Sequence, residues 1–280
     1  MSFWKLQRFF CFVIPIVFCL LVGLGAELMA HDKVVIAGTG DSQKLLRLLG
    51  KEYCRTHPHV VIDVPESVGN SGGIKLLLEG RCEFARVARE LTANELYYNF
   101  EYRHFAKSPI VFVVSANIKM VDNISPSQML ALYGGQITQW SELGPDFGKI
   151  YIANREKGDS SRSLIEKVFP AFTRIDPLSG KVLYTTQEVG RVLNSYDNII
   201  AYLPLAAVPD KGVRVLKFAG VPANRSTVTS GSYPLVIPLG LVWHGELSLL
   251  AADFIAFVGS LAGAEIILDA GAYPVSGLVR

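Results

Sequence analysis

Short apolar runs rich in valine and isoleucine alternate along the chain with amphipathic stretches of helical period. This alternation predicts βαβ units and a mostly parallel sheet, and therefore an α/β fold. In the first part of the chain, the predicted strands are residues 34–37, 60–64, 84–88 and 111–115, and the predicted helices are residues 42–55 and 72–79.

A second block of the same character runs from about residue 116 to residue 231. Ser125 followed by Pro126 predicts a capped helix start, and the Gly134–Gly135 pair predicts its end. Strands are expected at 150–153 and 199–203, with a helix between them. The apolar stretch 233–243 is expected to pair with 109–115, so that two chain crossings form a hinge between lobes. The tail predicts helices near 247–258 and 263–269 that return to the first lobe.

The first thirty residues differ from the rest of the chain. Lys5 and Arg8 precede an apolar run over residues 9–25, and Ala26 and Ala30 follow it. A basic start, an apolar segment and small residues together predict a secretory signal peptide over residues 1–30, and hence a periplasmic or otherwise exported protein. Because the run is also near the shortest length that spans a bilayer, an uncleaved N-terminal anchor is the alternative.

Composition restricts the classes of partner. The chain has 280 residues, half of them apolar, and a net charge of +2. A nearly neutral chain of this size folds around a substantial core and is not expected to bind nucleic acid or a membrane surface. Beyond the predicted signal peptide only Cys54 and Cys82 remain, and the sequence is compatible with either a disulfide or two buried thiols.

Three turns rich in glycine and small hydroxyl residues suggest the chemistry of the protein. They are residues 38–42 (Gly-Thr-Gly-Asp-Ser), 67–75 (Ser-Val-Gly-Asn-Ser-Gly-Gly-Ile-Lys) and 158–161 (Gly-Asp-Ser-Ser), each between a predicted strand and a predicted helix. Backbone amides at such helix starts attract anions, and Arg155, just before the third turn, adds a fork of donors. The sequence therefore predicts reversible binding of a tetrahedral oxyanion, with no cofactor and no metal.

The order of these motifs resembles the phosphate-binding components of ABC transporters, within the periplasmic type II binding proteins. Besides the three turns, the resemblance rests on residues 87–92 (Val-Ala-Arg-Glu-Leu-Thr), 133–144 (Tyr-Gly-Gly-Gln-Ile-Thr-Gln-Trp-Ser-Glu-Leu-Gly) and 271–275 (Gly-Ala-Tyr-Pro-Val). It implies two α/β lobes joined by a two-stranded hinge, lobe 1 being residues 31–113 plus 236–280 and lobe 2 residues 114–235. It also implies a monomer that captures phosphate or a similar oxyanion by lobe closure and delivers it to a permease in the inner membrane.

Carried over by position, the resemblance implies a set of ligand-binding residues. These are Thr39, Gly40, Asp41, Ser42, Asn70, Ser71, Gly72, Arg89, Arg155, Asp159, Ser160 and Ser161. For Arg89 two orientations are open, one facing the cleft and one covering the lobe surface, whereas Arg86 is expected to be structural. Arg155→Ala is expected to abolish oxyanion binding with the melting temperature nearly unchanged.

One departure from the family concerns the proton acceptor. Well-studied members carry an aspartate after the third strand that accepts a proton from hydrogen phosphate, whereas this chain has Ala88 there. Asp41 or Asp159 could replace it, since a buried carboxylate is tolerable beside a protonated oxyanion. Alternatively, each aspartate only caps its helix.

Two alternative functions remain open. The same fold could serve as a sensing or scavenging domain not tied to transport. Residues 69–73 also match the Gly-x-Ser-x-Gly pattern of serine hydrolases, with Ser71 as the nucleophile and His104 or His244 as the later histidine. Because residues 65–68 separate the motif from its strand, a non-enzymatic binding protein is the preferred interpretation.

Overall fold

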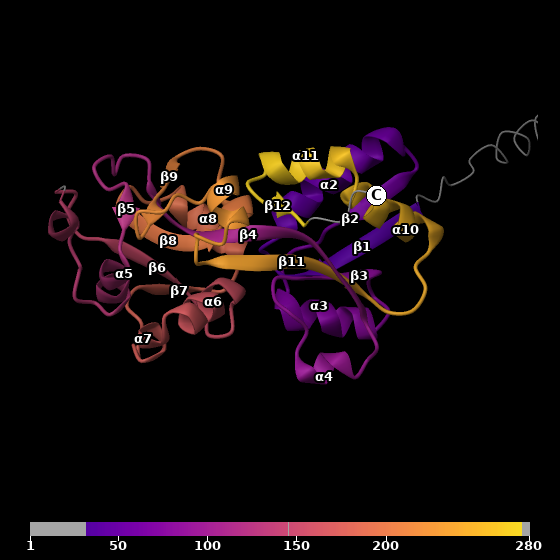
Figure 1. Cartoon of the computed structure of the whole chain (residues 1–280), viewed down its shortest axis with the longest axis horizontal. Coiled ribbons are helices and arrows are strands. Elements are labelled where there is room, and N and C mark those ends of the chain that lie inside the picture. Colours follow the sequence, from indigo (N-terminus) through magenta and orange to yellow (C-terminus); the bar gives the residue numbers. More distant parts are fainter. Residues whose placement is uncertain (1–31, 145, 276–280) are drawn as a thin grey trace, which may run out of the picture. The chain divides into compact units, whose positions relative to one another are not determined.

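The computed structural model describes residues 32–144 and 146–275, and from residue 33 onward the described residues form one compact unit. Within this unit the elements form two lobes, with helices on the faces of a sheet in each (Figure 1). The α/β class and the two-lobed arrangement expected from the sequence are confirmed. The predicted signal peptide lies outside the described residues.

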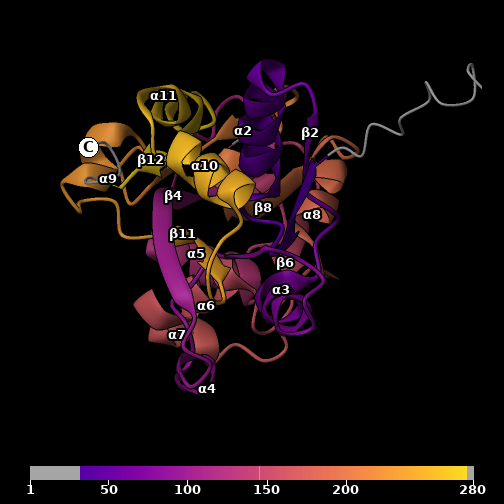
Figure 2. The same cartoon turned by 90° about the vertical axis from the view of Figure 1, so that its right-hand side faces the viewer.

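Lobe 1 is built on a sheet with the strand order β2-β1-β3-β11-β4. Helices α2, α10 and α11 lie on one side of this sheet and α3 on the other, as Figure 2 shows in the turned view. The bounds are β1 Asp32–Gly38, α2 Gln43–Thr56, β2 Val60–Asp63, α3 Gly69–Leu78, β3 Phe84–Val87, α4 Ala93–Leu96, β11 Val236–Trp243, α10 Leu249–Val258, α11 Leu261–Asp269 and β12 Tyr273–Pro274.

The inner strands β1 and β3 of lobe 1 contribute side chains to both faces of the sheet, which explains why they read as apolar runs. In β1, Val34 and Ile36 pack into the larger core cluster, whereas Ala37 belongs to a smaller cluster with Ile74 and Leu77 of α3. Alternation of side chains across a strand sends neighbouring residues to opposite faces, so each strand contributes to two cores.

Lobe 2 carries the strands β8, β6 and β7 in that spatial order, with β6 parallel to both neighbours. The bounds are β5 Asn123–Ile124, α5 Pro126–Tyr133, β6 Tyr151–Arg155, α6 Ser160–Val168, α7 Pro170–Thr173, β7 Lys181–Leu183, α8 Thr186–Leu193, β8 Ile199–Pro204, β9 Val213–Val215, β10 Lys217–Phe218 and α9 Arg225–Thr229, with short 3-10 helices at Trp140–Leu143 and Leu205–Ala207.

Two antiparallel strands connect the lobes. The long strand β4, Glu101–Ser115, pairs with β11 over its first part and with β8 from Ile110 onward. The expected pairing of 233–243 with 109–115 is therefore wrong in register, because β11 pairs with Glu101–Pro109 as the chain runs back into lobe 1. Where the lobes meet, the Ile110 amide donates to the Leu235 carbonyl at 2.8 Å, so the two crossings lie side by side.

Several local predictions are confirmed and one is corrected. Ser125 caps α5 in a capping box: its hydroxyl accepts from the Gln128 amide at 3.2 Å, and Gln128 accepts from the Ser125 amide at 2.9 Å. The predicted helix over 72–79 instead begins at Gly69, so the glycine-rich turn forms its first turn. The tail helices α10 and α11 return to lobe 1, as predicted, and pack on α2.

The cysteines resolve an open alternative. Within the described residues, Cys54 and Cys82 are both free thiols. Cys54 lies on α2, whereas Cys82 packs with the α3 core on the other side of the sheet, so the sheet separates the two side chains.

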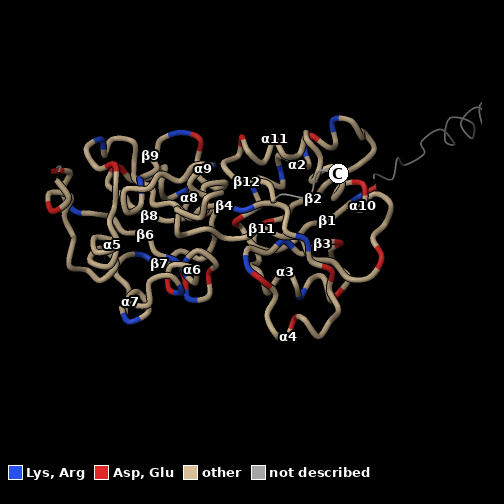
Figure 3. The backbone as a smooth tube through the Cα atoms, viewed as in Figure 1, with Lys and Arg blue, Asp and Glu red and all other residues tan. Residues whose placement is uncertain are grey.

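Neither the distribution of charged residues nor the hydropathy of the helices points to a particular binding partner. Basic and acidic residues are interspersed along the described chain (Figure 3). Among those residues, no single helix is long and apolar enough to cross a membrane; α10 and α11 meet the criterion only as a pair, with a bend of 59° between them.

Candidate functional site

The first turn joins β1 to α2, and a buried arginine holds its backbone in place through hydrogen bonds. Arg86, which is fully buried, donates to the Thr39 carbonyl at 2.7 Å, to the Pro65 carbonyl at 2.8 Å and to the Ile36 carbonyl. A Cβ on Gly38 would lie 2.1 Å from the Arg86 carbonyl oxygen, so only glycine fits there. Arg86 is therefore structural, as the sequence suggested.

The second turn is the start of α3, and it is hydrogen-bonded to the first turn and packs closely against it. The Val68 amide donates to the Gly38 carbonyl at 3.1 Å, and Gly73 packs so closely that a Cβ on it would meet the Gly38 Cα at 2.6 Å. Asn70 accepts from the Ala88 amide at 2.8 Å and donates to the Ser160 hydroxyl at 2.9 Å. Since Ser160 belongs to lobe 2, Asn70 joins the second and third turns across the lobes.

The third turn presents a buried ion pair. Arg155 ends β6, and its Nη2 atom lies 2.5 Å from Oδ2 of Asp159, with both side chains less than a tenth exposed. Asp159 caps α6 by accepting from the Arg162 amide at 3.0 Å through its other oxygen, Oδ1. The Nε and Nη1 atoms of Arg155 are buried and have no hydrogen-bond partner in the part of the chain that the structure describes. Arg155 is therefore held in place by Asp159 while keeping two donors free.

Asp41, in the first turn, faces lobe 2. Its Oδ1 atom accepts from the Thr186 hydroxyl at 2.7 Å. Its Oδ2 atom and the Ser42 hydroxyl are buried and have no hydrogen-bond partner among residues 32–144 and 146–275. Burial, and next the charge of Asp159, raise the pKa of Asp41 to about 6, against the opposing effects of Arg155 and of the Thr186 and Ser160 hydroxyls. These influences require Asp41, Arg155, Asp159 and Ser160 to be neighbours, so the first and third turns converge.

The two aspartates thus differ, and the capping interpretation holds for only one of them. Asp159 is a helix cap, as predicted. Asp41 is not: the N-cap position of α2 is Ser42, which makes no side-chain cap bond, and the hydrogen bond from Thr186 goes to Asp41 across the lobes. Within the described residues, Asp41 instead carries an unpaired buried carboxylate oxygen, and the charge of Arg155, which has two unpaired donor atoms, acts on it.

Other predicted site residues lie around this cluster or apart from it. Thr39 and Ser161 are buried, Gly72 is half-buried and Ser71 is exposed on the first turn of α3. Arg89 lies apart: it donates to both carboxylate oxygens of Glu95, at 2.7 and 2.8 Å, and so joins the α4 region of lobe 1.

The serine-hydrolase alternative has no support in this geometry. Ser71 lies inside α3, not on a sharp turn directly after a strand. His104 lies 3.1 Å from Glu90, and His244 lies edge-on to Phe100. Neither histidine is thus paired with Ser71 in the described part of the chain.

Sequence reasoning missed two residues of the site, Thr186 and Gln187 at the start of α8. Thr186 donates to Asp41, and Gln187 donates to the Gly40 carbonyl at 3.1 Å. The pattern Thr185-x-x-Glu188 marks the helix start, with the Glu188 amide donating to the Thr185 hydroxyl at 3.1 Å. Nothing in that pattern indicates that the next two side chains face the other lobe.

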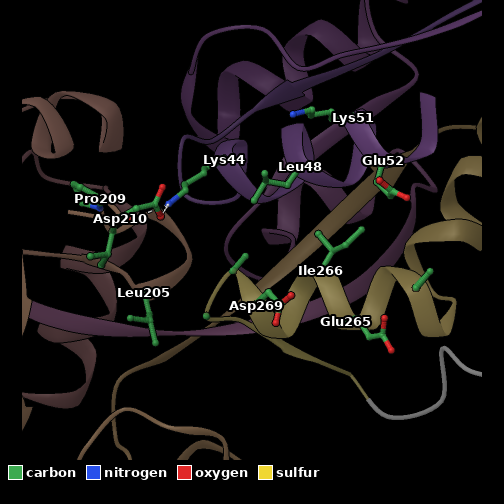
Figure 4. Close-up of a pocket in the computed structure, with 14 residues that line it drawn as sticks. Lys44, Leu48, Lys51, Glu52, Leu205, Pro209, Asp210, Glu265, Ile266 and Asp269 are labelled. Carbon is green, nitrogen blue, oxygen red and sulfur yellow. Dashed lines mark hydrogen bonds and ion pairs between the residues drawn. The ribbon is translucent and has the colours of Figure 1, made fainter. Parts of the chain in front are cut away.

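A separate cavity of about 710 Å³ lies between α2, α11 and the segment 205–210 (Figure 4). At its edge Lys44 of α2 donates to the Val208 carbonyl at 3.0 Å and to Asp210 at 2.6 Å, which adds a further contact between the lobes. The cavity wall contains acidic and basic side chains and none of the three turns. It is therefore distinct from the cluster around Asp41 and Arg155.

Known proteins resemble this chain over much of its length. A profile of the family described as "PBP superfamily domain" matches residues 26–260. The phosphate-binding protein PstS of Bacillus subtilis is 24% identical over 259 residues, which cover 90% of this chain and 84% of that protein. The phosphate-binding protein PstS 2 of Streptococcus pneumoniae is 32% identical over 136 residues, and this match spans only 44% of either chain.

Solved structures agree on the fold. A putative phosphate ABC transporter substrate-binding protein from Clostridium perfringens, with bound phosphate, superposes with a TM-score of 0.76 at 24% identity and covers 88% of this chain and 100% of its own. A phosphate-binding protein from Stenotrophomonas maltophilia gives a TM-score of 0.64 at 14% identity, covering 87% of this chain and 91% of its own.

Proposed function

Because the chain belongs to the PBP superfamily domain family, we propose that it is a solute-binding protein that captures phosphate, or a similar tetrahedral oxyanion, by lobe closure for an ABC transporter. The relatives are named as phosphate-binding proteins, and the C. perfringens neighbour as a transporter component with bound phosphate. The protein acts as a monomer without a cofactor, and its partners are the oxyanion and a permease in the inner membrane.

One observation carries the proposal: a buried arginine with two unpaired donors lies beside a buried aspartate with one unpaired oxygen. A fully ionised oxyanion would be repelled by that carboxylate, whereas a protonated oxyanion donates to it. Hydrogen phosphate combines a hydroxyl for Asp41 with charged oxygens for Arg155 and Ser42.

We therefore propose Asp41 as the proton acceptor, in place of the family aspartate that is absent at Ala88. Asp159 is the weaker candidate because both its oxygens are engaged, one by Arg155 and one by the α6 amide. Of the predicted set, Arg89 is left out because its donors go to Glu95. The proposed ligand-binding residues are Thr39, Gly40, Asp41, Ser42, Asn70, Ser71, Gly72, Arg155, Asp159, Ser160 and Ser161.

The remaining parts of the proposal concern location and organisation. Residues 1–30 act as a signal peptide that exports the protein to the periplasm. Lobe 1 then comprises residues 31–113 plus 236–280, and lobe 2 comprises residues 114–235.

Calorimetric titration of the purified protein, dialysed free of anions, tests this function with phosphate and sulfate from pH 5 to 8. We expect phosphate binding across this range and no sulfate binding at pH 7 to 8. Equal affinity for both anions at pH 8 would exclude Asp41 as an unprotonated acceptor, and no heat with either would exclude oxyanion capture.

Gly40→Ala tests closure at the first turn. A Cβ there would lie 2.6 Å from Oε1 of Gln187 and 3.1 Å from the Thr186 Cβ, so Gln187 must swing away and lose its bond to the Gly40 carbonyl. We expect phosphate affinity to fall about tenfold, as for loss of one buried hydrogen bond, with the fold intact. Gly190→Ala in α8 is the matched control, since its nearest atom would lie at 3.8 Å. Unchanged affinity in Gly40→Ala would mean that this contact is absent from the bound state.

A further inference from the structure

We infer that Thr186 of lobe 2 orients the carboxylate of Asp41 in lobe 1 through the hydrogen bond between them. Thr186 is then a positioning residue for the selection of protonated oxyanions, acting through Asp41 and not on the ligand. This inference rests on the proposed function.

The geometry separates the role of Thr186 from that of an ordinary helix cap. The N-cap of α8 is Thr185, which already accepts the Glu188 amide. Thr186 is the first helical residue, 3% exposed, and its hydroxyl donates at 2.7 Å to a residue 145 positions earlier in the chain. Its hydroxyl is therefore free of any capping task and is directed at Asp41.

The hydrogen bond decides which oxygen of Asp41 faces the site. With Oδ1 engaged by Thr186, the unpaired buried oxygen among the described residues is Oδ2, and the charge of Arg155 acts on this carboxylate. A carboxylate without this bond could rotate about its terminal torsion, which has broad minima, and lose a fixed acceptor position. Orientation of the acceptor thus depends on a side chain from the opposite lobe.

The same bond stabilises the charged form of Asp41. The charged groups that act on Asp41 are Asp159 at the start of α6, which raises its pKa together with burial, and Arg155 of β6, which lowers it; the hydroxyls of Thr186 and Ser160 lower it further. Loss of the Thr186 hydroxyl therefore raises the pKa of Asp41. A protonated Asp41 donates a hydrogen bond instead of accepting one, and then no longer rejects sulfate.

Closure and selection are consequently linked. The Thr186–Asp41 bond crosses between the lobes together with the bonds from Gln187 to Gly40 and from Lys44 to Val208 and Asp210. Opening by separation of α8 from the first turn breaks the bond that orients Asp41. The acceptor is therefore ordered only in the closed state, where it is needed to distinguish ligands.

Thr186→Val and Thr186→Ser test this inference as a pair, because valine keeps the shape without the hydroxyl and serine keeps the hydroxyl. The readout is the ratio of phosphate to sulfate affinity in the purified protein at pH 7.5, together with the pH at which sulfate binding disappears. We expect Thr186→Ser to keep the ratio of the unaltered protein. We expect Thr186→Val to lower it by about tenfold or more and to retain sulfate binding to higher pH. Thermal melting of both variants reports that they are folded, and Thr186→Ala is a second variant without the hydroxyl.

The outcomes distinguish this inference from the function on which it rests. If the unaltered protein binds no phosphate, the proposed function fails first. If it binds phosphate and the valine and serine variants share its ratio, Thr186 does not orient Asp41. Loss of phosphate binding in Thr186→Val without any gain of sulfate binding would also contradict the inference, because Thr186 would then only hold the lobes together.

Discussion

Arg155→Met is expected to reduce phosphate affinity by at least about a hundredfold, since two charge-assisted hydrogen bonds of roughly 1.5–3 kcal/mol each are lost. The unpaired Nε and Nη1 atoms of this buried side chain are the strongest donors in the cluster around Asp41. Calorimetry with phosphate measures the effect. An affinity close to that of the unaltered protein would show that Arg155 does not contact the anion.

Arg155→Met is also expected to destabilise the protein, in contrast to the nearly unchanged melting temperature that the sequence alone led us to expect for Arg155→Ala. Arg155 and Asp159 form a buried ion pair, and removing one partner of such a pair typically costs about 3–5 kcal/mol. The double variant Arg155→Met with Asp159→Asn serves as the control, because asparagine still caps α6 without a buried charge. We expect it to recover much of the stability in urea denaturation but none of the phosphate binding. Equal loss of stability in both variants would contradict this separation.

Much of the fold could be predicted from the sequence because it depends on local patterns. Alternating apolar strands and capped helices specify an α/β arrangement in which helices pack on a mostly parallel sheet. The three turns could be found because glycine and small hydroxyl residues between a strand and a helix expose backbone amides at the helix start, where anions bind. Ser125, Asp159 and the tail helices were predicted for similarly local reasons.

The parts that could not be predicted depend on contacts between distant segments. The register of β11 on β4 follows from where the chain turns back into lobe 1, not from either strand alone. Thr186 and Gln187 join the site because of the way α8 meets the first turn across the lobes, and their own sequence resembles any helix start. The stability role of Arg155 was hidden for the same reason, since burial of its pair with Asp159 appears only in three dimensions.

Asp41→Asn is expected to invert the choice between anions, with the phosphate-to-sulfate ratio falling by at least about a hundredfold at pH 7.5. Asparagine keeps an oxygen for Thr186 and turns an amide donor towards the site where the carboxylate oxygen was. Hydrogen phosphate then loses its acceptor, while sulfate loses the repulsion that excluded it. Titration with both anions measures the ratio; continued rejection of sulfate by the variant would assign selection to another residue.

The raised pKa of Asp41, about 6 instead of 3.8, gives this variant a second expected result. Because the folded protein holds the proton more tightly than the unfolded chain, protonation of Asp41 stabilises the fold. That contribution is complete below about pH 4 and is lost as the pH rises through about 6. Asparagine does not titrate, so the stability of Asp41→Asn relative to the unaltered protein should rise between pH 4 and 7, by up to about 3 kcal/mol in anion-free urea denaturation. Over the same range the unaltered protein should begin to bind sulfate as the pH falls below about 6, whereas the variant binds it throughout. Parallel pH profiles for the two proteins would mean that Asp41 is not the group that links protonation to anion choice.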